Sequence, residues 1–176
     1  RMGGTAMKIA GVIVEYNPFH NGHQYHLART REITGADFVV TVMSGDFVQR
    51  GEPALLDKYT RARMALLGGA DLVLELPVPF ACGSAGDFAS GAVALLNRLG
   101  TVDALCFGSE CGRIEPLWSL AGLLEKESPS FSGSLRQGLK QGLPYPQARA
   151  RALGAAFEEP ALPLLSSPNN ILGLEY

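Results

Sequence analysis

The sequence predicts a doubly wound α/β fold, in which helices cover both faces of a parallel sheet. Three observations favour this class: apolar, β-branched runs, helix-like segments between them, and Gly or Pro residues at the boundaries. Strands are expected at 8–14, 37–43, 71–76 and 102–107. Helices are expected at 21–33, 58–67 and 84–99, and a long polar loop at 44–53. Repeated strand–helix–strand units of this size are typical of a parallel sheet.

The second part of the chain is predicted to be helical, because no strand-like run follows Cys111. Helices are expected at 115–127, 135–141 and 147–157, and the segment 167–176 has the pattern of a helix start. We therefore divide the chain into a core at 7–112 and a helical extension at 113–176, which we expect to continue in a longer protein. Residues 1–6 are expected to be a remnant of cloning, with the natural start at Met7 or, alternatively, Met2.

Composition narrows the class of protein further. The chain has 176 residues, of which 47% are hydrophobic and 18% charged, as expected for a globular protein. No apolar run reaches the roughly 20 residues that span a bilayer, so no membrane partner is expected. Three cysteines without a CxxC pair favour a reduced, cytoplasmic setting. The formal charge of −2 argues against strong nucleic-acid binding by this piece alone.

All three histidines, His20, His23 and His26, follow the first predicted strand directly. In open parallel sheets ligands bind beyond the carboxyl ends of the strands, and a helix start attracts anions. Gly22 would let a nucleotide approach the backbone, while His20 and His23 would donate hydrogen bonds to its phosphates or carry charge near neutral pH. The alternatives are a metal site and ordinary surface histidines. We expect no metal site, because no carboxylate cluster or CxxC pair completes a ligand set.

The segment His20-Asn21-Gly22-His23 matches the HxGH signature of the nucleotidylyltransferase superfamily. With the segments 14–23, 43–54, 107–110 and 167–173, the chain resembles the bacterial tRNA(Met) cytidine acetate ligase family from Met7 to Tyr176. The resemblance implies a Rossmann-like HxGH fold, with 7–112 as the nucleotide-binding core. It also implies that acetate and ATP give acetyl-adenylate and pyrophosphate. The acetyl group then passes to N4 of the wobble cytidine of elongator tRNA(Met).

The resemblance also implies the site residues. His20 and His23 are the expected catalytic residues, acting on the α-phosphate and the leaving pyrophosphate, and Mg²⁺ is expected on the phosphates. The expected nucleotide-binding residues are Ile13, Val14, Glu15, Tyr16, Asn17, Pro18, Phe19, His20, Asn21, Gly22, His23, Gln24, Tyr25, His26, Gly108, and Asn169 or Asn170. The family's further ATP-site arginine lies beyond Tyr176, so this piece alone is expected to be an incomplete enzyme.

The loop after the second predicted strand is a weaker candidate. Ser44, Gly45, Gln49 and Arg50 are expected to shape the acetate pocket or meet the tRNA, and a purely structural loop is the alternative. Lys58, Arg61 and Arg63 offer a basic helix start for RNA phosphate, against the alternative of an ordinary solvated face.

Two other functions stay open from the sequence. One is a small-molecule nucleotidylyltransferase, which would join its substrate to AMP permanently. The other is a catalytically silent module that binds nucleotide or tRNA. Pyrophosphate release that depends on acetate separates these functions from the acetate ligase.

Overall fold

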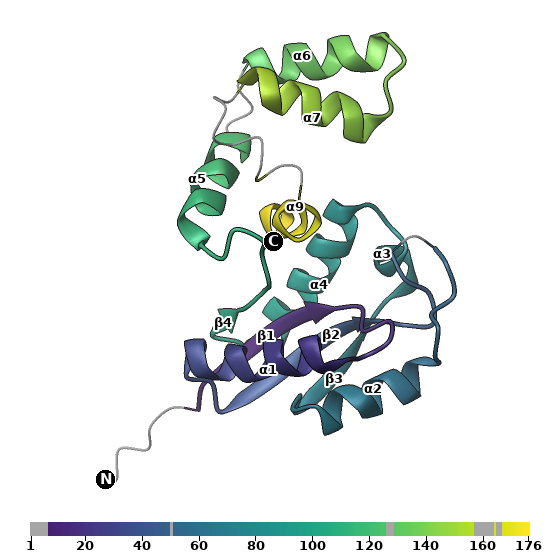
Figure 1. Cartoon of the computed structure of the whole chain (residues 1–176), viewed down its shortest axis with the longest axis vertical. Helices are drawn as coiled ribbons and strands as arrows, with labels where there is room; N and C mark the ends of the chain where they lie inside the picture. The colour runs from purple at the N-terminus through teal and green to yellow at the C-terminus, as the bar shows by residue number, and fades with distance from the viewer. Residues whose placement is uncertain (1–6, 50, 126–128, 157–163, 165–166) are drawn as a thin grey trace. The chain divides into compact units, whose positions relative to one another are not determined.

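A computed structural model describes residues 7–49, 51–125, 129–156, 164 and 167–176. The chain forms two compact units. The first runs to Phe107 and includes Tyr176, and the second comprises Gly108–Glu175. Figure 1 shows the strands in the first unit and helices alone in the described part of the second.

The first unit is built on a four-stranded parallel sheet. Its strands are β1 (Ile9–Val14), β2 (Phe38–Ser44), β3 (Leu72–Leu76) and β4 (Ala104–Leu105), in the order β3-β2-β1-β4. The pairing of β1 with β2 runs in register from Ile9↔Phe38 to Val14↔Met43. Because the apolar residues of these strands are buried on both faces, the sequence shows continuous apolar runs rather than strict alternation.

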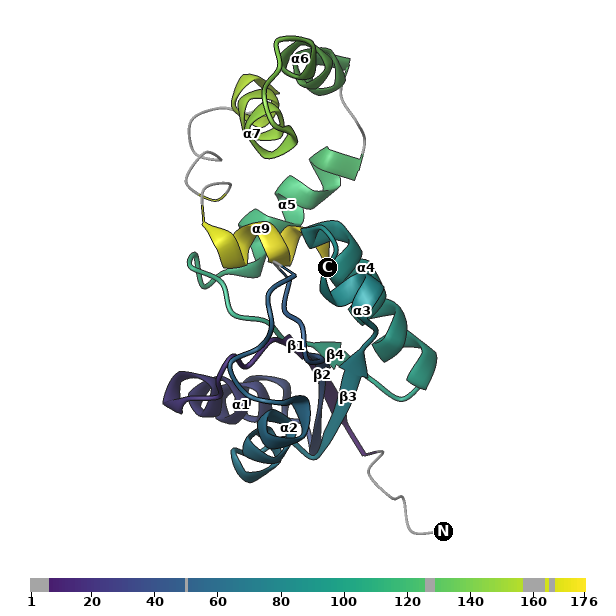
Figure 2. The same cartoon turned by 90° about the vertical axis from the view of Figure 1, so that its right-hand side faces the viewer.

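Helices cover both faces of this sheet, as predicted. The helices α1 (Asn21–Thr34) and α2 (Lys58–Leu67) lie on one face, and α3 (Val78–Ala81) and α4 (Ala85–Leu99) lie on the other (Figure 2). The predicted doubly wound α/β class is therefore confirmed. On the α4 side, Gly11 lets the helix approach β1, because a Cβ at this position would lie 2.7 Å from a methyl carbon of Leu96.

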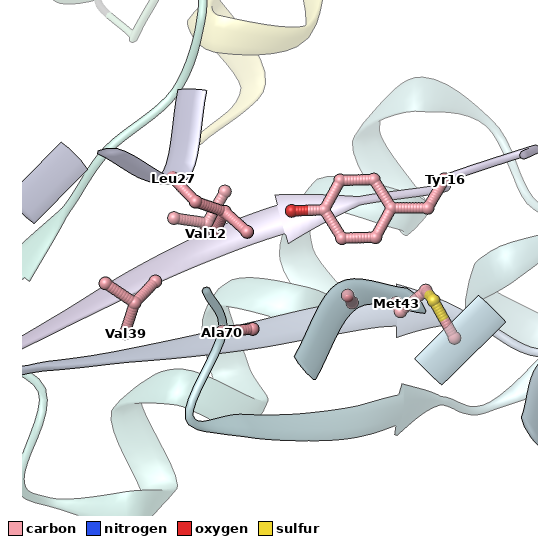
Figure 3. Packing of buried hydrophobic residues seen from close by; sticks show 7 residues of the cluster. Val12, Tyr16, Leu27, Val39, Met43 and Ala70 are labelled. Carbon is pink, nitrogen blue, oxygen red and sulfur yellow. The ribbon is translucent and has the colours of Figure 1, made fainter. Parts of the chain in front are cut away.

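A hydrophobic cluster joins α1 and α2 to the sheet. Its members come from β1, β2, the two helices and the turns next to them: Val12, Tyr16, Leu27, Val39, Met43, Ala65 and Ala70. Figure 3 shows that Tyr16 lies along this layer, with its hydroxyl pointing toward Val12 and Leu27. The cluster fixes the start of α1 against β1, which places the histidine turn.

Two elements of the first unit differ from the sequence prediction. The fourth strand was expected over 102–107 but spans only Ala104–Leu105, because it pairs with β1 at two positions alone. The helix α3 was not expected, since Pro77 was interpreted as a stop after β3. Pro79 is nevertheless tolerated there, because it occupies the first turn, where a backbone N–H has no helical acceptor.

The second unit contains α5 (Ile114–Glu125), α6 (Pro129–Lys140), α7 (Tyr145–Ala156) and α9 (Pro168–Glu175). The helices α6 and α7 pack against each other, and α5 packs against α9. The start of α6 was predicted too late, and α7 begins at Tyr145 with Pro146 in its first turn. Of the helices expected at 115–127 and 147–157, the last residues lie outside the described part of the chain. No described helix has the length and apolar content needed to cross a membrane.

The strand order places a switch point beside β1. The chain passes from β1 to β2 on one side of the sheet, and β4 adds on the other side of β1. In open α/β sheets the crevice for a ligand forms beyond the carboxyl end of a strand at such a point. The turn from β1 to α1, which carries the histidines, occupies this position.

Candidate active site at the histidine turn

His20 and His23 cap the start of α1 reciprocally. His20 is the N-cap residue with an extended backbone, and its Nδ1 accepts a hydrogen bond from the Gly22 N–H at 3.0 Å. The Nδ1 of His23 accepts from the His20 N–H at 3.3 Å. Ser, Thr, Asn and Asp are the usual N-cap residues, so two imidazoles perform here what a hydroxyl and a carboxylate perform in an ordinary capping box.

This arrangement fixes the tautomer of both rings. A neutral imidazole carries its proton on one nitrogen and accepts at the other. Because both Nδ1 atoms accept backbone N–H groups, the hydrogen-bond network assigns the proton of each neutral ring to Nε2. The two rings stack with their centroids 3.7 Å apart. The turn therefore presents two Nε2–H donors at the start of a helix, where an anion is already favoured.

The ring of His23 is held by aromatic neighbours. Its centroid lies 4.7 Å from that of Tyr16 and 5.7 Å from that of Phe19. Burial lowers the pKa of His23 to about 4, with smaller contributions from His20 and His26, so the free protein keeps this ring neutral at pH 7. The expectation that His23 carries charge near neutral pH is corrected accordingly. In this neutral state its Nε2–H is available as a hydrogen-bond donor.

Burial also lowers the pKa of His26, one turn further along α1. Its Nε2 is buried and has no hydrogen-bond partner among the described residues. A neutral ring whose Nε2 is buried presents no charge to an anion at the start of the helix.

Gly22 is required by the imidazole of His20. A Cβ at position 22 would lie 2.9 Å from Cε1 and 3.0 Å from Nδ1 of that ring. The sequence suggested a different reason, the approach of a nucleotide to the backbone. The structure gives a second reason for glycine at position 22: without a Cβ there, the His20 ring can come close enough to accept the Gly22 N–H.

The remaining residues of the 13–26 stretch divide into buried and exposed ones. Tyr16 is buried, with 1% of its surface exposed, and Ile13 is buried as well, so a nucleotide can meet them only through their backbone. Asn21, Gln24 and Tyr25 are exposed on the first turns of α1. Val14, Pro18 and Phe19 are partly buried.

Two polar residues of the same stretch bind the neighbouring loop. The Glu15 Oε1 accepts the Gln49 N–H at 2.7 Å, and the Asn17 Oδ1 accepts the Leu55 N–H at 2.7 Å. The two loops that leave β1 and β2 are therefore held side by side.

The loop after β2 is ordered by its own hydrogen bonds. A short bridge joins Phe47 to Pro53, and the Val48 N–H donates to the Glu52 carbonyl at 3.0 Å. Ser44 is completely buried, and a Cβ at Gly45 would lie 2.3 Å from the Glu75 carboxylate. The Ser44 side chain is therefore poorly placed to contact acetate or RNA. Arg50 lies outside the described residues.

The basic start of α2 does not face solvent as a group, which corrects the sequence interpretation. Arg61 is completely buried, and its guanidinium donates to backbone carbonyls of Glu15, Ser44, Gly45 and Leu56. The Lys58 amine lies 2.8 Å from the Glu75 carboxylate. Arg61 and Ala65 are four residues apart and lie together on the buried face of α2, but this spacing alone does not show from the sequence that the face is buried.

In the second unit, the two candidate asparagines have different surroundings. Asn170 is 2% exposed, and its Oδ1 accepts the Glu110 N–H at 3.1 Å. Asn169 is exposed, and its backbone and side-chain N–H groups donate to Glu110 Oε1. Glu110, which was not singled out from the sequence, also accepts the Asn170 N–H at 2.9 Å and so caps α9 from a loop 60 residues away. Gly108 belongs to the same unit.

Among the described residues no cluster of three or more His, Cys, Asp or Glu side chains has a geometry that could hold a metal ion. The histidine turn instead offers two imidazole groups and the backbone N–H groups of a helix start, an arrangement that favours an anion.

The model of the family described as HIGH Nucleotidyl Transferase matches residues 7–176. The chain belongs to this family. The HIGH nucleotidyl transferase signature corresponds here to His20-Asn21-Gly22-His23, the turn whose geometry is described above.

Relatives within the HIGH nucleotidyl transferase family include two proteins named tRNA(Met) cytidine acetate ligase. The protein of Acetivibrio thermocellus is 54% identical over 97% of this chain and 41% of its own length, and that of Caldicellulosiruptor bescii is 54% identical over 97% and 42%. The crystal structure of Thermotoga maritima TmcAL bound with alpha-thio ATP matches with a TM-score of 0.90 and 47% identity, over 97% of this chain and 42% of that one. The chain thus spans about two fifths of the length of these proteins.

Proposed function

We propose that this chain is the nucleotide-binding catalytic part of a tRNA(Met) cytidine acetate ligase. The single observation that carries the proposal is the reciprocal His20–His23 cap, which presents two Nε2–H donors at the switch point of the sheet. The identity of 54% to proteins of that name, and the alpha-thio ATP bound by the Thermotoga maritima relative, support it.

In this proposal ATP lies with its phosphates against the start of α1. Unpaired backbone N–H groups and the positive end of the helix dipole favour an anion there. The Nε2–H groups of His20 and His23 donate to non-bridging phosphate oxygens. Since His23 is neutral in the free protein, it contributes a fixed dipole and does not depend on proton uptake. Mg²⁺, expected on the phosphates, would neutralise the charge of the departing pyrophosphate.

The first step joins acetate to AMP. A carboxylate oxygen of acetate attacks the α-phosphorus, the bond from this phosphorus to the bridging oxygen breaks, and pyrophosphate leaves with the electron pair. Acetate is already an anion, so the step needs no general base. The site has to hold two anions together and stabilise the charge that develops on the phosphate oxygens, which preorganised donors do without reorganisation.

The second step transfers the acetyl group to RNA. The N4 amine of the wobble cytidine attacks the acetyl carbonyl, the carbonyl carbon loses its bond to the phosphate oxygen, and AMP leaves. The amine proton passes to solvent or to AMP. Elongator tRNA(Met) and acetate are the proposed substrates, in the cytoplasm where this tRNA is used.

The site residues of the proposal follow the local geometry. His20 and His23 are the catalytic donors, and Gly22 with the N–H groups of the first turn completes the phosphate site. Of the two asparagines we assign the nucleotide contact to Asn169, which is exposed, while Asn170 holds the Gly108–Cys111 loop. Ser44 and Gly45 are assigned to the framework of the pocket rather than to its lining.

The test is pyrophosphate release by the full-length protein with ATP, with and without acetate, followed by mass spectrometry of tRNA(Met). Release that requires acetate, together with an acetylated cytidine, is expected. Release driven by a mononucleotide instead of acetate would replace the proposal with a small-molecule nucleotidylyltransferase. ATP binding without any release by the full-length protein would indicate a catalytically silent module.

A further inference from the structure

Arg61 is a buried cation with an unusual set of partners. No part of the residue is exposed, and no carboxylate forms an ion pair with it in the described part of the chain. Among the described residues its guanidinium donates to backbone carbonyls alone: Nη1 to Glu15 at 2.6 Å, Nη2 to Ser44 at 3.0 Å and to Gly45, and Nε to Leu56 at 3.0 Å. A planar fork with five donors can satisfy such a set, whereas an ammonium group cannot match its geometry.

These carbonyls belong to the segments that leave the sheet at the candidate site. Glu15 follows β1 and begins the histidine turn, while Ser44 ends β2 and Gly45 follows it. Side chains of the same loops make further bonds between them, from Gln49 N–H to Glu15 and from Leu55 N–H to Asn17. Arg61 lies behind this network and fixes the peptide groups on which it is built.

The peptide that follows the Glu15 carbonyl leads to Tyr16, whose φ of 49° lies in the left-handed region. A bulky residue keeps this conformation only where its surroundings impose it. The hydrogen bond from Arg61 to the Glu15 carbonyl holds the peptide group before Tyr16, and the hydrophobic cluster holds the Tyr16 ring. The Tyr16 ring in turn packs against His23, with 4.7 Å between centroids.

We propose that Arg61 is a positioning residue that acts on His23 through the Glu15–Tyr16 peptide and the Tyr16 ring, and so aligns the Nε2–H donor with the reacting phosphate. This inference rests on the proposed function for its chemical step, and on the described contacts for its structural step. It assigns Arg61 a role inside the protein and not a contact with RNA or nucleotide.

The chain offers a matched control in Arg31 of α1. Its guanidinium also donates to two backbone carbonyls, those of Asp37 at 2.7 Å and Gly69 at 2.9 Å, and it pairs with Asp71. These partners lie at the amino-terminal ends of β2 and β3, away from the histidine turn. Arg31→Lys therefore perturbs a comparable clamp at the other edge of the sheet.

The experiment compares Arg61→Lys with Arg31→Lys in the full-length protein. Both variants are expected to lower the melting temperature. Only Arg61→Lys should slow single-turnover adenylate formation at saturating ATP, by at least tenfold, with less than a threefold change in the Kd of ATP. The ¹⁵N signals of His23 should shift in the folded Arg61→Lys protein and stay unchanged in Arg31→Lys. A loss of stability alone would leave both the rate of the folded enzyme and the His23 signals unchanged.

An Arg61→Lys protein that keeps its rate within twofold and its His23 signals, or that loses ATP affinity alone, would overturn the proposal. If Arg61→Lys does not fold, Tyr16→Leu removes the ring contact while retaining Arg61, and the same loss of rate is expected; a retained rate overturns it. If wild-type protein shows no acetate-dependent release, the proposed function fails. The His23 signals of the two arginine variants then still decide the positioning role.

Discussion

Gly22→Ala separates the geometry of the histidine turn from the stability of the fold. The new methyl group would lie 2.9 Å from Cε1 of His20, where ordinary contacts begin at 3.4 Å, so the ring has to retreat by about 0.5 Å. This movement weakens the hydrogen bond from the Gly22 N–H to Nδ1 and shifts the His20 ring in its stack on His23. Displacing a catalytic group by about 1 Å costs roughly 100-fold, so we expect the adenylation rate to fall by about 10- to 100-fold.

The effect on stability should be small, because two contributions oppose each other. Losing an N-cap acceptor costs about 0.5–2 kcal/mol, while alanine in place of glycine in a helix stabilises by up to about 1 kcal/mol. The free energy of unfolding should therefore change by no more than about 1.5 kcal/mol. Gly133→Ala in α6 is the control, since no atom lies within 4 Å of a Cβ there, and it should change neither rate nor affinity.

The assays are single-turnover formation of acetyl-adenylate at saturating ATP by the full-length protein, and urea denaturation of the same samples. If Gly22→Ala reacts within twofold of the wild-type rate, the reciprocal cap is not what aligns the donors. If it unfolds, the turn is needed for folding, and its role in aligning the donors is no longer supported.

Three further predictions concern His23 and Glu110. His23→Ala should lower the adenylation rate by about 100- to 1,000-fold, with a smaller loss of ATP affinity. The reason is that only interactions stronger in the transition state than in the ground state accelerate the step. Equal losses of rate and affinity would make His23 a binding residue. In the free protein the His23 imidazole should titrate near pH 4, by NMR, instead of near 6.5. Since the unfolded chain then binds more protons, the stability that His23 contributes is complete above pH 6.5 and is lost as the pH falls toward 4; a midpoint near 6.5 would contradict this. Glu110→Ala should lower the free energy of unfolding by about 1–2 kcal/mol and weaken hydrogen-exchange protection of α9, whereas Glu115→Ala in α5 should not affect α9.

The sequence predicted the core of the fold because its strands are apolar runs with clear boundaries. The β1–α1 turn could be located from Val14, Pro18 and the histidines alone, since the pattern changes there from strand to helix. The length of β4 was overestimated, because the apolar run continues beyond the two residues that pair with β1. Pattern cannot distinguish residues that are buried from residues that also pair.

The chemical state of the site could not be predicted in the same way. The identity and position of His20 and His23 follow from the sequence, but the neutrality of His23 depends on the rings of Tyr16 and Phe19, which pack against it. Arg61 was interpreted as a possible RNA contact because residue type indicates charge and not direction. Only the three-dimensional structure brings the carbonyls that surround it together, from segments up to 46 residues away.

Acetate labelled with ¹⁸O in both oxygens shows directly whether acetate attacks the α-phosphorus of ATP. In the proposed reaction an acetate oxygen attacks the α-phosphorus and stays on it when the acetyl group leaves. AMP recovered from the full-length protein with ATP, labelled acetate and tRNA(Met) should therefore carry one heavy oxygen, and acetylated tRNA should appear with it. AMP without the label would show that another nucleophile attacks the phosphorus, and would contradict acetate activation at this site.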